Sequence, residues 1–156
     1  MGLHRLVILL ALALAVPAFA QDGRVWNFDD NPEAPALGFG APDSDDLVIG
    51  LSCEPSAKQM TIVASVGSTR LVPGPSVSLK LSAGTTSLSL IGNAIANETD
   101  GTVSIEVTGA PNPRLFSLLR AGPSLTIEVP GATETIPLGG AAPHVALLEK
   151  LCLGRR

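Results

Sequence analysis

The chain has 156 residues, of which 46% are hydrophobic and only 15% are charged, and its formal charge is −4. This length suits one domain with a single hydrophobic core. A net negative charge argues against nucleic acid as a partner, and an aromatic content of 3% argues against stacking surfaces for sugars or single-stranded nucleic acid.

The first twenty residues, 1–20, have the pattern of a signal peptide. Arg5 precedes an apolar run at 6–16, and the end of the segment has the small-x-small spacing that a signal peptidase needs. The run is too short to span a bilayer comfortably, and no second apolar run of spanning length follows it. We therefore expect cleavage before Gln21, a periplasmic or secreted location and no membrane span after signal removal. An uncleaved N-terminal anchor is the alternative.

Residues 21–46 predict an irregular N-terminal segment that lies over the domain, because prolines, glycines and small residues are frequent there. Within it, residues 25–28 alternate and could form a short edge strand. Trp26 and Phe28 allow two interpretations. They either cover the edge of a sheet or stand exposed as an anchor for a partner.

From residue 47 onward, apolar and polar residues alternate in short runs separated by Gly- and Pro-rich turns, which indicates antiparallel strands. The expected strands are 47–53, 60–65, 70–72, 77–81, 88–90, 103–108, 124–129 and 135–138. Pro137 confines the last of them to a sheet edge, because proline cannot donate to a strand ladder.

Two segments interrupt this alternation and predict short helices, at 112–122 and 143–152. In the first, Asn112 can cap the helix, Pro113 suits its first position and Gly122 suits the position after its end. The fold class expected is therefore mainly β, an antiparallel β-sandwich or small barrel of six to eight short strands. One or two short helices accompany the strands, the last at the C-terminus.

The two cysteines, Cys53 and Cys152, predict one disulfide bond if the protein is exported to an oxidising compartment. The bond would close residues 47–156 into a disulfide-closed β-domain and stabilise it by about 4–5 kcal/mol in the chain-entropy view. Two free thiols are the alternative.

The order of these features resembles the small secreted bacterial proteins of the invasion-associated locus B type, and the accessory proteins of type VI secretion with the same general plan. The residues that carry the resemblance are Leu51-Ser52-Cys53, Ile136-Pro137-Leu138-Gly139-Gly140-Ala141, and then Val145, Leu148 and Cys152. An aromatic residue often precedes the Leu-x-Gly turn in such families, and Ile136 stands there instead. The resemblance implies an accessory protein of the envelope and supplies no catalytic residue.

The residues themselves provide little for catalysis or for binding a metal. His144 is the only histidine after the signal segment, and no Gly-x-Ser-x-Gly motif is present. The acidic run 43–46 lacks the ligand spacing of an EF-hand, so a solvated loop explains it better than a Ca²⁺ site. One histidine and two bonded cysteines cannot form a zinc site. We therefore expect no enzyme activity, no cofactor and no metal.

The function expected from the sequence is that of an exported, non-catalytic envelope protein that binds a protein partner of unknown identity. Its candidate contacts are the N-terminal segment with Trp26 and Phe28, or the loops at 73–75 and 111–113. The alternative is a proteinaceous inhibitor of an exported hydrolase such as a lysozyme, which would present Arg70 or Arg114 from a rigid loop. A hydrolase with an unrecognised serine ranks last, because His144 alone would have to serve as its base.

Overall fold

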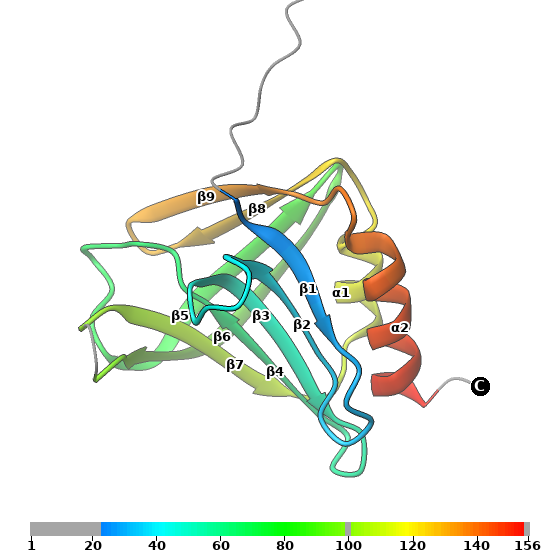
Figure 1. The fold of residues 1–156 in the computed structure, drawn as a ribbon. Helices are drawn as coiled ribbons and strands as arrows, with labels where there is room; N and C mark the ends of the chain where they lie inside the picture. Colours follow the sequence, from blue (N-terminus) through cyan, green and yellow to red (C-terminus); the bar gives the residue numbers. More distant parts are fainter. Residues whose placement is uncertain (1–22, 99–100, 155–156) are drawn as a thin grey trace, which may run out of the picture.

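The computed structural model describes residues 23–98 and 101–154, so the expected signal segment lies outside the described residues. Figure 1 shows a single curled sheet with two helices side by side at one end of it. All strand pairs are antiparallel, and the nine strands follow the order β1-β2-β3-β4-β7-β6-β5-β8-β9. The strands are β1 (Val25–Asp29), β2 (Ala36–Gly40), β3 (Leu47–Glu54), β4 (Gln59–Ala64), β5 (Gly74–Ala83), β6 (Thr86–Ala96), β7 (Val103–Gly109), β8 (Ser124–Val129) and β9 (Ala132–Pro137).

The mainly β, antiparallel fold class is confirmed, whereas the expected sandwich or closed barrel of six to eight strands is wrong. The nine strands form one half-barrel, whose edges β1 and β9 are not paired with each other through their backbones. Register shifts occur at Phe39/Gly40 and at Gly74/Val77. Irregularities of this kind bend strands and increase their twist. A sheet that bends this far encloses its own core and needs no second sheet.

Part of the segment expected to be irregular belongs to this sheet. Residues 25–28, expected as a short edge strand, lie in β1. Residues 36–40 form β2, which the sequence did not predict. β2 contains two glycines and one alanine, so its alternation is hard to recognise in the sequence. The stretch 70–72, by contrast, lies in the connection between β4 and β5 rather than in a strand.

Both predicted helices are present, as α1 (Pro113–Leu118) and α2 (Ala141–Leu153). The Asn112 side chain accepts a hydrogen bond from the backbone N–H of Arg114 at 3.0 Å, so its predicted role as the cap is confirmed. Gly122 does not follow the end of α1, because the helix ends at Leu119 in right-handed conformation. Within the described residues, neither helix has both the length and the apolar character needed to cross a membrane.

The core lies between the inward face of the curled sheet and the two helices. In β8, for example, the fully buried Leu125 and Ile127 alternate with outward polar side chains. The helices contribute Leu115, Phe116 and Leu148, each 0% exposed. In the part of the chain that the structure describes, no polar or charged residue is buried in this core. Hydrophobic packing and the strand ladders therefore hold the sheet in shape.

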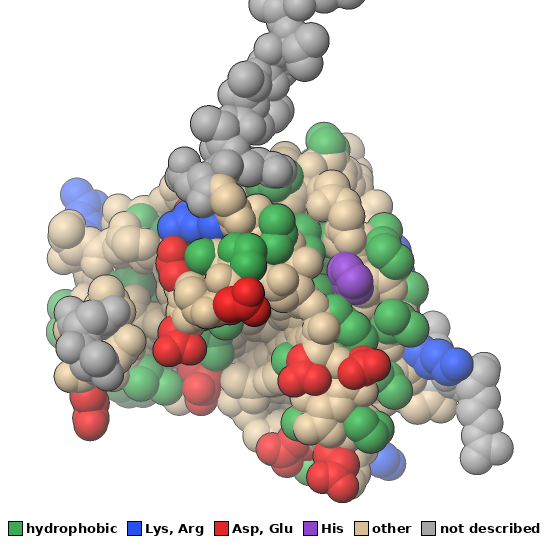
Figure 2. All heavy atoms as spheres, viewed as in Figure 1, with side chains coloured by type: hydrophobic (Ala, Val, Ile, Leu, Met, Phe, Trp, Pro, Cys, Tyr) green, Lys and Arg blue, Asp and Glu red, His purple; other side chains and the backbone are tan. Residues whose placement is uncertain are grey.

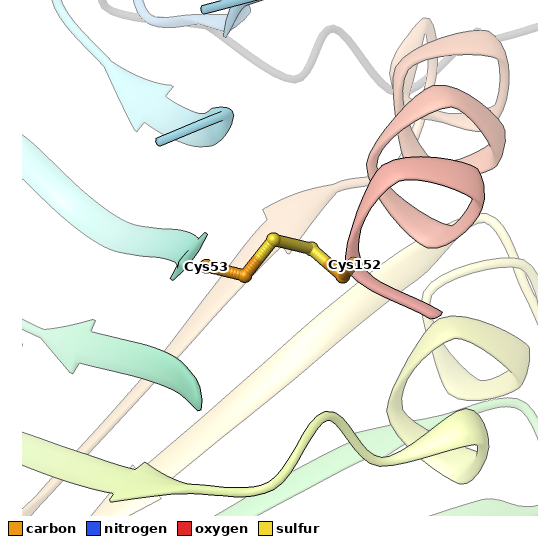
Figure 3. The surroundings of a disulfide bond; sticks show 2 residues. All are labelled: Cys53 and Cys152. Atoms are coloured by element: carbon orange, nitrogen blue, oxygen red, sulfur yellow. A yellow bond between two sulfur atoms is a disulfide. The ribbon is translucent and has the colours of Figure 1, made fainter. Parts of the chain in front are cut away.

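The predicted disulfide bond is present and joins β3 to the last turn of α2 (Figure 3). Cys53 and Cys152 are separated by 99 positions in the sequence, and their Cα atoms lie 5.8 Å apart. Both side chains are buried, with 3% and 6% of their surface exposed. The bond therefore attaches α2 to the sheet from inside the core.

Candidate functional site

Trp26 lies in the core and not on the surface. Its side chain is 8% exposed, and its ring centroid lies 5.4 Å from that of Phe39. The indole N–H donates a hydrogen bond of 2.8 Å to the carbonyl oxygen of Pro137 at the end of β9. An ion pair of 3.3 Å also joins Arg24, the residue before β1, to Glu134 on β9. Trp26 thus connects the two edges of the half-barrel, and this placement favours the edge-covering interpretation.

Phe28 is half-buried on the same strand and contacts α2. Its ring stacks on that of His144, with the centroids 5.7 Å apart and the planes 18° from parallel. The Nδ1 atom of His144 is buried without a hydrogen-bond partner. The stack positions β1 against the helix.

The two candidate arginines are exposed, but they lie at opposite ends of the fold. Arg70 lies in the β4–β5 connection, and the aliphatic part of its side chain packs over Gly131 in the β8–β9 turn. Arg114 lies in the first turn of α1, at the helical end seen in Figure 1. Trp26, Phe28, Arg70 and Arg114 therefore do not form one surface.

The acidic segments have structural roles in turns. Asp29 accepts a hydrogen bond of 3.0 Å from the backbone N–H of Asn31, and Asn31 accepts one of 3.1 Å from that of Glu33. Asp46 lies 3.6 Å from Arg24. Among residues 23–98 and 101–154, no three His, Cys, Asp or Glu side chains come together as metal ligands.

One hollow lies on the outward face of the sheet, over the strands β1 to β4. Its floor is a row of cross-strand neighbours, Asn27, Gly38, Gly50 and Val63, which are paired in register from β1 to β4. The two central positions have no side chain, so the backbone of β2 and β3 forms the bottom. We call this surface the outer hollow. It has a volume of about 540 Å³ and is lined by Asn27, Phe28, Asp29, Ala36, Leu37, Gly38, Ala41, Asp43, Ser44, Leu47, Gly50, Leu51, Ser52 and Val63.

Leu47 supplies the apolar wall of the outer hollow. Its Cδ2 atom lies 2.8 Å from the position that a Cβ atom of Gly38 would occupy, and its Cδ1 atom lies 3.6 Å from the corresponding position at Gly50. It remains 37% exposed. The Leu47 side chain therefore covers the floor at Gly38, and most of the surface that stays accessible inside is apolar.

Acidic side chains border the outer hollow. Its lining contains Asp29 and Asp43 but no lysine or arginine. Figure 2 shows acidic groups around a hollowed part of this face, with few basic groups. No sequence motif marks this site, although glycines inside strands are a recognised sign of close approach by another chain or ligand.

A second hollow, of about 780 Å³, lies among the loop residues 65–69, the acidic residues Asp45 and Asp46 and the start of β7. Loops form most of its wall, whereas paired strands form the floor of the outer hollow. The outer hollow is therefore the candidate site.

Comparisons with protein-family models, with curated proteins and with solved structures found no match to this chain. The resemblance to the invasion-associated locus B type therefore stays a prediction. Any functional interpretation rests on the residues of the chain itself.

Proposed function

We propose that the chain is an exported, non-catalytic binding domain, and that it contacts a protein partner through the outer hollow. The observation that carries the proposal is the construction of this surface, an accessible apolar floor made by four paired strands. A floor of paired strands changes little when a partner binds, so little conformational entropy is lost on association. The buried disulfide bond suits an oxidising compartment.

The outward position Ser52 offers a direct test, because it lines the outer hollow and is half-buried. A photo-crosslinking amino acid placed there should give an adduct with one defined envelope protein. Ser82 is the matched control, since it is a half-buried serine on the outward face of β5, between Ser87 and Thr126. The same adducts at both positions, or none at Ser52 under several growth conditions, would contradict the proposal.

Export is tested separately by the intact mass of the protein isolated from cells. We expect a chain that starts at Gln21 and is two hydrogens lighter than its reduced form. A mass that includes residues 1–20 would contradict cleavage, and free thiols in the isolated protein would contradict an oxidising compartment.

Inhibition of an exported hydrolase is the second candidate function, and the exposure of Arg114 supports it. This residue follows Pro111, Asn112 and Pro113, and the Asn112 cap fixes the start of the helix. A rigid loop with an exposed cation suits entry into an enzyme cleft. The test is inhibition of a panel of lysozymes and other exported hydrolases by the chain and by Arg114→Ala, with the exposed Lys150→Ala as control. Equal inhibition by Arg114→Ala and Lys150→Ala would exclude the segment around Arg114 as the inhibitory contact.

A further inference from the structure

We infer that the outer hollow binds an extended segment of the partner in which two basic side chains, four residues apart, flank a central apolar residue. The inference rests on the proposed function and specifies the chemistry of the partner. Three properties of the outer hollow lead to it: its length, its charge and its apolar floor.

The length follows from the register of β1 and β2. Asp29 is paired with Ala36 at one end of the outer hollow, and Asp43 follows Gly40 in the loop at the other end. From Ala36 to Gly40 there are four steps along the strand, or about 13 Å at 3.3 Å per residue. An extended partner segment has the same rise. Since alternate side chains point the same way, residue i can face Asp29 while residue i+4 lies at the Gly40 end, beside the loop that contains Asp43.

The charge follows from the absence of cations in the lining. Neither Asp29 nor Asp43 forms an ion pair with any described residue, and the lining contains no lysine or arginine. The basic group closest in sequence to β1, Arg24, is already paired with Asp46 and Glu134. Two carboxylates without counter-ions attract a basic segment and repel an acidic one.

The apolar floor determines the residue between the two cations. Residue i+2 of such a segment would lie over Gly50, against Leu47 and Val63, because the Leu47 side chain covers Gly38. A valine or a residue of similar size would bury apolar surface there. The expected pattern is therefore basic-x-apolar-x-basic. It reads the same in both directions, so either orientation of the segment satisfies it.

Two isosteric substitutions remove the charges while keeping the backbone. Asp43 has a φ of +55°, a left-handed conformation that asparagine tolerates well, so Asp43→Asn should fold normally. Asp29→Asn keeps the side-chain oxygen that accepts the hydrogen bond from Asn31. Asp45→Asn is the matched control, because this exposed residue lies in the same loop outside the lining.

One further substitution fills the hollow and leaves the charges unchanged. A Cβ atom at Gly50 would meet only Leu47 Cδ1, at 3.6 Å, and the backbone of Gly50 is not left-handed. Valine also favours strands, so Gly50→Val should fold while projecting into the space over the floor. Gly109→Val on β7 is the control, because a Cβ atom there would meet nothing within 4 Å and the residue does not line the outer hollow.

The experiment is an NMR titration of the ¹⁵N-labelled mature chain with the peptide acetyl-Gly-Lys-Thr-Val-Thr-Lys-Gly-amide. We expect shifts of the Gly38 and Gly50 amide signals, and affinity that falls when NaCl rises from about 0.05 to about 0.5 M. Each of Asp29→Asn and Asp43→Asn should weaken binding about two- to five-fold, as expected for exposed ion pairs. Gly50→Val should weaken it at least about ten-fold, whereas Asp45→Asn and Gly109→Val should leave it unchanged.

Several outcomes would overturn the inference. The first is equal or tighter binding of the peptide with glutamate in place of both lysines. The others are shifts that do not involve the floor of the outer hollow, or no binding at all. If the crosslinker at Ser52 still gives a defined adduct, and Asp29→Asn with Asp43→Asn does not reduce it, the proposed function stands and only the basic chemistry of the partner is refuted.

Discussion

Removing the disulfide bond with the double substitution Cys53→Ala and Cys152→Ala should cost most of the stability of the domain. The bond joins positions 99 residues apart, and a ring of that size restricts the unfolded chain by about 4–5 kcal/mol in the chain-entropy view. Typical domains have about 5–15 kcal/mol in total. Because both cysteines are buried, the small voids left by alanine add to the loss and do not offset it.

Urea unfolding of the oxidised protein, of the reduced protein and of the double variant measures this loss. Without the bond, the unfolded chain exposes more surface, so the slope of the free energy against urea should increase together with the loss of stability. The reduced protein should match the variant within about 1 kcal/mol, since both have lost the ring. A loss below about 1 kcal/mol, or an unchanged slope, would refute the entropic reasoning.

Three further substitutions test individual contacts through urea or thermal unfolding. Trp26→Phe keeps an aromatic ring but removes the donor to the carbonyl of Pro137, so the free energy of unfolding should fall by about 1–2 kcal/mol. An unchanged unfolding midpoint would contradict a bridge between the sheet edges. Asn112→Ala removes the helix cap and should cost about 1 kcal/mol, whereas aspartate at this position should restore the stability. Gly84→Ala should lower the free energy of unfolding by more than about 1 kcal/mol. Gly84 has a φ of +55°, and a Cβ atom there would collide with the carbonyl oxygen of Ala121. No change in stability would show that this turn can move away.

The alternation of apolar and polar residues predicted the positions of most strands. In β7 and β8, residues such as Ile105 and Ile127 are buried as the pattern requires. β6 extends beyond the expected 88–90, because the alternation breaks at Ile91, an apolar residue that faces outward. Gly92 follows, at a place where the carbonyl oxygen of Glu106 leaves no room for a side chain. Glycine has no side chain to mark a face, so the pattern stops before the strand does.

Strand order could not be predicted from the same pattern, because a buried face looks alike in a sandwich and in one curled sheet. The neighbours β4 and β7, and likewise β5 and β8, meet through long-range pairing that no short motif records. The candidate site was missed for a related reason. Gly38 and Gly50 are twelve positions apart in the sequence and belong to no recognisable motif. They form one surface only because the register of β2 and β3 pairs them.

The position of Cys53 near the end of β3 divides the domain into two unequal parts. The covalent ring contains β4 to α2, while the β1–β2 hairpin lies outside it. This hairpin can separate from the sheet by breaking the β2–β3 ladder and the contacts of β1 with β9 and α2, without stretching the ring. Its amides should therefore exchange with solvent through partial openings that leave the rest of the sheet protected. A ligand in the outer hollow would bind across the β2–β3 boundary and slow that exchange.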